Sequence, residues 1–192
     1  MRRLFNVVLG LLIGSTLLAS SNGFASDDVW KRLEAGGRVI LLRHTVTTSG
    51  VGDPPGMRLG DCATQRNLTE QGRAHARAIG AAFRSRGLKP ERVLSSPWCR
   101  CIETAQLAFG GSQPETALSN LFGRSENRER QVEALRVLVA AHAGSGNLVL
   151  VTHGSTIVAL TGVSPDFGEM VVVAPRPGGK FVVEGRFTVP ER

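Results

Sequence analysis

Short apolar runs alternate with segments of helical spacing along the middle of the chain. The runs cover residues 39–42, 92–96 and 148–152, and each precedes a segment with helical periodicity or a helix-start signal. Runs of this length, bounded by polar residues, are typical of buried strands, whereas the longer segments between them are typical of helices. This alternation predicts an α/β fold, a three-layer α/β/α sandwich with a mainly parallel central sheet.

The helical segments carry recognisable start and stop signals. In the first, Thr69 is suited to cap the start of the helix and Gly87 to end it. His75 lies on the polar side of this segment and is predicted to be solvated. Further helices are predicted over residues 97–110, 128–142 and 154–160.

Two other segments complete the pattern. The chain closes with apolar residues 168–174 and 180–189, and the turn predicted at 175–179 joins them into a hairpin or an extension of the sheet. Residues 45–66 instead form a long connection with little secondary structure and several Gly and Pro residues. Loops of that length are usually functional or disordered, and this one is suited to fold over a pocket.

The first residues have the layout of a secretory signal. Arg2 and Arg3 form a basic start, an apolar stretch runs from about residue 4 to residue 19, and small residues mark a cleavage site after Ala25. The short, Gly-interrupted apolar stretch disfavours the alternative, an uncleaved signal anchor. We therefore predict a signal peptide over residues 1–25 and one domain over 26–192, periplasmic or secreted and free of the membrane after cleavage.

Charge and cysteine content narrow the function classes. The net charge of +7 becomes +5 without the two arginines of the leader, a modest excess that favours an anionic small molecule or surface but is also compatible with a soluble basic protein. Because no aromatic residues are interleaved with the scattered arginines, no nucleic-acid partner is expected. In an oxidising compartment Cys62 could form a disulfide with Cys99 or Cys101, whereas those two are too close in sequence to bridge each other comfortably. The cysteine spacing matches no common zinc pattern, so no metal or other cofactor is expected.

Polar residues follow each of the three predicted strands. Arg43 and His44 follow the first, Arg100 lies one turn into the helix after the second, and His153 follows the third. The carboxyl ends of parallel strands meet at one edge of a sheet, where ligands bind in open α/β folds. Guanidinium groups bind phosphate oxygens, and an imidazole near cations stays neutral and nucleophilic. These residues therefore predict a phosphate site that contains a potential nucleophile.

Four motifs occur in order along the chain: LLRHT, NLTEQG, SSPWCRCIETA and VTHG. Together they resemble the histidine phosphatase superfamily, whose fold is phosphoglycerate-mutase-like. The resemblance spans residues 39–154 and implies that His44 is the nucleophile, forming a phosphohistidine that water then hydrolyses. It also implies that Arg43, Arg100 and His153 hold the phosphoryl group and stabilise its transition-state charge.

The sequence departs from the family pattern at two positions. Thr45 stands where the family usually has Gly, which adds a side chain near the pocket. Many members carry a proton-donating Glu in a stretch that here ends in Asn120, and an amide cannot donate a proton as a carboxylic acid would. Asp53, in the long loop, is the first candidate for this role and Glu126 the second. The phosphohistidine phosphatases of the family need no such acid because their leaving group is a good one.

The leading hypothesis is an exported, metal-independent phosphatase that hydrolyses phosphomonoesters or phosphoramidates through a phosphohistidine on His44. Its expected substrate is a phosphorylated small molecule or envelope sugar, similar to that of the lipopolysaccharide core heptose phosphatases. Two alternatives stay open: a pseudoenzyme that binds a phosphorylated ligand without turnover, and a mutase of the same superfamily. The motifs identify neither the substrate nor the oligomeric state.

Overall fold

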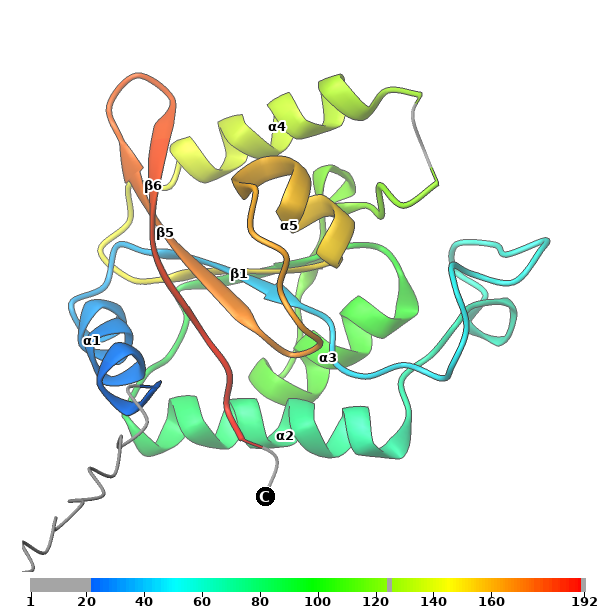
Figure 1. The fold of residues 1–192 in the computed structure, drawn as a ribbon, viewed down its shortest axis with the longest axis horizontal. Helices are drawn as coiled ribbons and strands as arrows, with labels where there is room; N and C mark the ends of the chain where they lie inside the picture. The colour runs from blue at the N-terminus through cyan, green and yellow to red at the C-terminus, as the bar shows by residue number, and fades with distance from the viewer. Residues whose placement is uncertain (1–21, 124–125, 191–192) are drawn as a thin grey trace, which may run out of the picture.

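The computed structural model describes residues 22–123 and 126–190, in which one sheet lies between two layers of helices (Figure 1). The elements in chain order are α1 (Asn22–Glu34), β1 (Val39–Arg43), η1 (Cys62–Thr64), α2 (Glu70–Ser85), β2 (Arg92–Ser95), α3 (Cys99–Phe109), β3 (Gln113–Pro114), η2 (Thr116–Leu118), α4 (Arg128–Ala140), β4 (Leu148–Thr152), α5 (Gly154–Thr161), β5 (Met170–Arg176) and β6 (Lys180–Phe187). The η elements are single 3₁₀ turns.

The sheet has the strand order β3-β2-β4-β1-β5-β6. Neighbouring strands from β3 to β1 are parallel, whereas β5 is antiparallel to both β1 and β6. Because β1, β2 and β4 run in the same direction, their C-terminal ends lie side by side: Arg43 is in register with Thr152, and Ser95 with Val151. The predicted mainly parallel sheet and the terminal hairpin are both confirmed.

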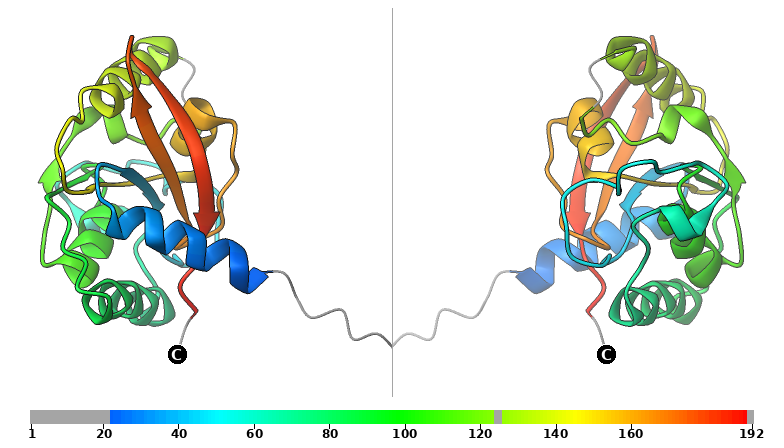
Figure 2. Two further views of the ribbon diagram at one scale, coloured as in Figure 1. Left: turned by 90° about the vertical axis from the view of Figure 1, so that its left-hand side faces the viewer. Right: turned by 90° about the vertical axis from the view of Figure 1, so that its right-hand side faces the viewer.

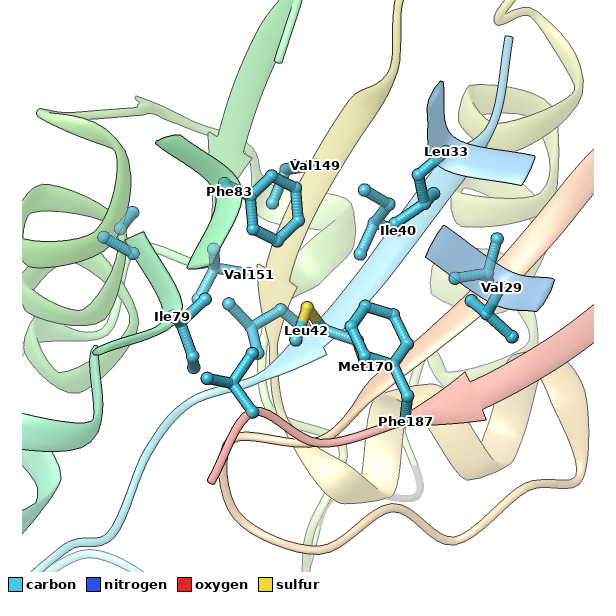
Figure 3. Packing of buried hydrophobic residues seen from close by; sticks show 14 of the residues in the cluster. Val29, Leu33, Ile40, Leu42, Ile79, Phe83, Val149, Val151, Met170 and Phe187 are labelled. Carbon is cyan, nitrogen blue, oxygen red and sulfur yellow. The ribbon is translucent and has the colours of Figure 1, made fainter. Parts of the chain in front are cut away.

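Alternate side chains of each buried strand point to opposite faces of the sheet. On one face, Ile40 and Leu42 of β1 pack with residues of α1, α2 and α3. Figure 3 shows Leu33 of α1 and Phe83 of α2 among them. On the other face, the intervening residues of β1 pack with α4 and α5. Figure 2 shows these two layers of helices from the sides, and the predicted α/β/α sandwich is thereby confirmed.

The predicted helix signals act as expected. The Thr69 hydroxyl accepts a hydrogen bond from the backbone N–H of Gly72 at the start of α2, and α3 ends at Gly110, whose φ of 84° is left-handed. Gly72 also fixes the position of α2, because a Cβ there would lie 2.1 Å from the carbonyl oxygen of Val46. The helix therefore packs directly against the chain that leaves the end of β1.

The interpretation of His75 as a solvated residue is wrong. Its side chain is buried, and its Nε2 lies 2.8 Å from the carbonyl oxygen of Val189 in the C-terminal segment. That segment runs from β6 to α2, as Figure 1 shows, and covers α2 where His75 lies. The helical pattern of α2 gives no information about this later covering.

Residues 45–66 form the long connection that the sequence predicts, extending from the C-terminal end of β1 (cyan in Figure 1). Cys62 of this loop forms a disulfide with Cys99 at the start of α3, and Cys101 is a buried free thiol. The predicted disulfide from Cys62 is confirmed, and its partner is Cys99.

Most of the predicted signal peptide lies outside the described residues, and the predicted cleavage point after Ala25 falls within α1. Among residues 22–123 and 126–190, the helices are too short or too polar to cross a membrane.

Candidate active site

A pocket of about 400 Å³ opens at the edge of the sheet where β1, β2 and β4 end. Residues from the strand ends, the 45–66 loop, the segment after η2, the start of α5 and the segment before β5 line it. They are Arg43, His44, Gly50, Val51, Gly52, Arg66, Arg100, Asn120, Phe122, His153, Gly154, Ser155, Val158, Ser164 and Phe167. The pocket thus brings together Arg43, His44, Arg100 and His153, the four residues that the strand ends predict.

His44 is held as a neutral imidazole with a defined tautomer. Its Nδ1 lies 2.9 Å from the carbonyl oxygen of Thr45, which can only accept, so Nδ1 carries the hydrogen and Nε2 keeps the lone pair. Burial, and then the charges of Arg100 and Arg43, lower the pKa of His44 to about 3, although the hydrogen bond to Thr45 acts in the opposite direction. A neutral imidazole with a free Nε2 lone pair is the form required for nucleophilic attack.

Three arginines surround this imidazole, and each is anchored to the protein through a terminal nitrogen. Arg43 Nη1 donates to the carbonyl oxygen of Pro165 at 2.8 Å, Arg66 Nη1 donates to that of Gly50, and both terminal nitrogens of Arg100 contact Asp53. The Nε atoms of all three arginines are buried and have no hydrogen-bond partner in the described structure. A buried donor without a partner is costly, so these three Nε–H groups are available to an anionic ligand.

Arg43 is further held by its contacts with Phe167 and Gly154. The guanidinium carbon lies 3.8 Å from the centroid of the Phe167 ring, a cation–π arrangement. A Cβ at position 154 would lie 3.2 Å from Arg43 Nε, so glycine at the start of α5 leaves room for this guanidinium. The Gly of the VTHG motif thus has a steric role beside the pocket.

His153 is fully buried and packs edge-to-face against His44, with the ring centroids 5.4 Å apart. Its Nε2 lies 2.8 Å from Ser96 Oγ, and its Nδ1 lies 3.4 Å from Arg100 Nη2. A guanidinium can only donate, so Nδ1 accepts and Nε2 donates to Ser96. Burial, followed by the charges of His44 and Arg100, lowers the pKa of His153 well below its usual range.

Asp53, the first candidate for the proton donor, lies behind Arg100 rather than among the residues that line the pocket. Its Oδ1 lies 2.6 Å from Arg100 Nη1, and its Oδ2 accepts from Trp98 Nε1 at 3.0 Å. Burial acts to raise the pKa of Asp53, but its hydrogen bonds and the charge of Arg100 outweigh that effect and lower the pKa overall. The carboxylate is therefore held in its ionised form, as a hydrogen-bond acceptor.

The other residues singled out in the sequence divide between pocket and surroundings. Asn120 lines the pocket, and its Oδ1 accepts from Ser155 Oγ and from the backbone N–H of Phe122. Glu126 is exposed and does not belong to the pocket lining. Thr45 directly follows His44 but does not line the pocket, and its side chain is buried against Thr104. Among the described lining residues none is Asp or Glu.

Arg66 and Phe167 belong to the site but were not identified from the sequence. Arg66 directly precedes the NLTEQG motif, so an arginine next to a recognised motif was a usable signal. Phe167 lies in a short segment with no motif of its own, and nothing local in the sequence distinguishes it. Within the described parts of the chain, no group of three or more His, Cys, Asp or Glu side chains could hold a metal ion.

Comparison with known proteins finds similarity in part of the sequence and in the fold. The family model of the histidine phosphatase superfamily (branch 1) matches residues 39–121. The solved structure of the product of open reading frame Rv3214 from Mycobacterium tuberculosis is 18% identical with a TM-score of 0.61, covering 79% of this chain and 97% of that one. No curated protein matches the sequence.

Two further solved structures have the same fold. SixA from Agrobacterium tumefaciens is 23% identical with a TM-score of 0.53, covering 79% of this chain and 97% of its own. A phosphoserine phosphatase variant from Entamoeba histolytica, in complex with phosphoserine, is 15% identical with a TM-score of 0.57, covering 80% and 98%. The predicted phosphoglycerate-mutase-like fold is therefore confirmed.

Proposed function

Since motifs, family model and fold all agree on the histidine phosphatase superfamily, we propose that the protein is a phosphatase that uses His44 as its nucleophile. The His44 Nε2 lone pair attacks phosphorus, and the bond from phosphorus to the leaving group breaks, giving a phosphohistidine. Water then attacks the same phosphorus and the bond to Nε2 breaks. Inorganic phosphate is released, and neutral His44 is restored. Neither step requires a metal ion.

The observation that carries the proposal is the set of three buried Nε–H groups of Arg43, Arg66 and Arg100 around one neutral imidazole. Each guanidinium is anchored at a terminal nitrogen, so its remaining donors have a fixed direction. A phosphoryl group presents several equatorial oxygens that gain charge in the transition state, and fixed donors of this kind stabilise that charge.

The lining of the pocket favours substrates with a good leaving group. None of its described residues is a carboxylic acid, and Asn120 stands where many members of the superfamily carry a Glu. Without a general acid the leaving group must depart with little help from protonation. Phosphoramidates and aryl phosphates meet this condition. Export suggests a sugar phosphate as substrate, but its leaving group would be a strongly basic alkoxide.

Apolar side chains at the pocket mouth extend this preference. Val51 is 86% exposed, Phe122 54% and Val158 38%, and all three line the pocket. Exposed apolar residues grouped at a polar pocket are typical of ligand-binding sites. The proposed substrate therefore has a planar or apolar group next to its phosphoryl group. The predicted signal peptide supports a location of the protein outside the cytoplasm.

A pseudoenzyme that binds a phosphorylated ligand without turnover is the second candidate function. Asn120 is the observation that favours it, because an enzyme acting on simple alkyl phosphates would benefit from an acid at this point. The two candidates predict the same binding of inorganic phosphate and differ only in turnover.

The deciding experiment is hydrolysis of p-nitrophenyl phosphate by the protein with its disulfide intact. We expect turnover that EDTA does not reduce and that His44→Ala abolishes. His142→Ala is the matched control, because His142 lies outside the pocket, two residues after α4, and this variant should retain activity. A rapid-quench experiment should trap an acid-labile phosphoryl label on His44. Phosphate binding without hydrolysis would support the pseudoenzyme, and full activity of His44→Ala would exclude the proposed nucleophile.

A further inference from the structure

The carboxylate of Asp53 gathers hydrogen-bond donors from two segments that line the pocket. From the start of α3 it receives both terminal nitrogens of Arg100, at 2.6 and 3.2 Å, and the indole N–H of Trp98 at 3.0 Å. From the end of the 45–66 loop it receives the backbone N–H of Arg66 at 3.2 Å. One side chain, itself only 9% exposed, thus connects two of the three arginines of the site.

The geometry of Arg100 shows what this connection does. A guanidinium has two edges that can each bind an oxyanion, one formed by Nη1 and Nη2 and one formed by Nε and Nη2. Asp53 occupies the first edge. The second edge lies toward His153, which Nη2 contacts at 3.4 Å, and its Nε is buried without a partner. The contact with Asp53 therefore fixes the orientation of the second edge, whose Nε–H is the donor without a partner.

We propose, on the basis of the phosphatase function above, that Asp53 is a positioning residue that orients Arg100 and Arg66 toward the phosphoryl group, and that it is not the proton donor. The carboxylate acts only through these two arginines and through Trp98, whose ring packs against His153 at 5.4 Å between centroids. Its lowered pKa agrees with this role, because an ionised carboxylate accepts hydrogen bonds and has no proton to give.

Other contacts fix the backbone near the same point, and this makes the role of Asp53 separable. The Cys62–Cys99 disulfide and the hydrogen bond from Cys99 N to Gln65 Oε1, at 3.0 Å, both join the end of the loop to the start of α3. Because these contacts do not involve Asp53, the loop keeps two attachments to α3 when the carboxylate is changed. Loss of the carboxylate is therefore expected to affect mainly the direction of the arginine side chains.

The leaving-group dependence of Asp53→Asn distinguishes positioning from acid catalysis. The amide keeps the shape and one acceptor oxygen but loses the charge that pairs with Arg100. If Asp53 positions arginines, kcat/KM should fall by the same factor, about 10²-fold, for p-nitrophenyl phosphate and for phosphoserine, because misplaced donors affect both transition states. A proton donor would instead show a much larger loss with phosphoserine, whose leaving group is basic, and that result would overturn the proposal.

Combination with Arg100→Ala tests whether Asp53 acts through Arg100. When Arg100 is absent, Asp53→Asn should lower kcat/KM by less than about threefold further, because two changes in one interaction are not additive. If Asp53→Asn instead acted by lowering the general stability of the protein, it would reduce kcat/KM by the same factor with and without Arg100. That result would overturn the proposal. Asp61→Asn is the matched control, since Asp61 lies in the same loop, is paired with the exposed Arg58, and should stay within about twofold of the unmodified protein.

Binding of inorganic phosphate, measured by calorimetry, separates this proposal from the proposed function. Asp53→Asn makes the site more positive, so charge alone would strengthen binding, whereas misdirected arginines should weaken it by about tenfold or more. Tighter binding by Asp53→Asn would overturn the positioning role. If the unmodified protein binds phosphate but hydrolyses neither ester, the phosphatase function fails, while weaker phosphate binding by Asp53→Asn would still support the positioning role.

Discussion

The neutral state of buried His44 predicts a specific dependence of stability on pH. In the folded protein its pKa is lowered to about 3, first by burial and then by the charge of Arg100. In the unfolded chain the same imidazole has a pKa of about 6.5. Below that value the unfolded state binds a proton that the folded state does not bind. This residue therefore makes the folded state progressively less stable as the pH falls toward the folded pKa.

The magnitude follows from the two pKa values. Each pH unit below the unfolded pKa costs about 1.4 kcal/mol, so at pH 5 the cost from His44 is about 2 kcal/mol. At this pH the result depends only on the unfolded pKa, because the folded pKa of about 3 lies well below it. In His44→Gln the position no longer titrates, and the variant should avoid this loss.

The assay is urea unfolding of the unmodified protein and of His44→Gln between pH 8 and pH 5, with the disulfide kept oxidised. The difference in unfolding free energy at pH 8, where neither state binds the proton, gives the baseline cost of the substitution. From pH 8 to pH 5 that difference should shift by about 2 kcal/mol in favour of the variant. A difference that stays constant over this range would show that folded His44 titrates normally, and would refute the argument that burial and the arginines keep it neutral.

Three other predictions concern the pocket and its support. Replacing Cys62 and Cys99 together by Ser should lower the unfolding free energy by about 4 kcal/mol, because the disulfide closes a loop across a sequence separation of 37; an unchanged urea midpoint would contradict this. Asn120→Glu should raise kcat with phosphoserine at least tenfold and leave p-nitrophenyl phosphate little changed, since it adds an acid where the pocket has none; equal effects on both substrates would argue against this reasoning. Phe122→Ala should raise KM for p-nitrophenyl phosphate severalfold without changing the affinity for inorganic phosphate, and a parallel change in both would show that Phe122 supports the phosphate site rather than the leaving group.

The parts of the structure that local patterns encode were predictable from the sequence. The three apolar runs form the strands β1, β2 and β4, which end at Arg43, Ser95 and Thr152. Alternation of strand and helix restricts their topology to a few right-handed arrangements. Once the strands are parallel, these residues meet at one edge regardless of the details of packing. The location of the site therefore followed from topology alone.

The partners of individual side chains could not be predicted in the same way. The sequence offers Asp53 as the first candidate for the proton donor, and nothing local in it indicates that the carboxylate pairs with Arg100, 47 residues further along the chain. His75 was interpreted as solvated, but a segment 114 residues away covers it. Such contacts depend on how an irregular loop and a terminal segment fold back, and neither of these has a periodic pattern. The chemical nature of a residue was thus visible in the sequence, whereas its protonation state was not.

The balance of charge in the pocket explains why these partners matter for function. Arg43, Arg66 and Arg100 place three guanidinium groups around His44, and Asp53 offsets only part of this charge. Burial, and then this positive charge, keep His44 and His153 neutral, and the charge is itself costly to bury. A phosphoryl dianion would offset that charge on binding, and attack by Nε2 would then place the new positive charge of His44 beside the phosphoryl oxygens. The contact between this new charge and the phosphoryl oxygens exists in the transition state and not in the bound substrate, which is the condition for catalysis rather than for binding alone.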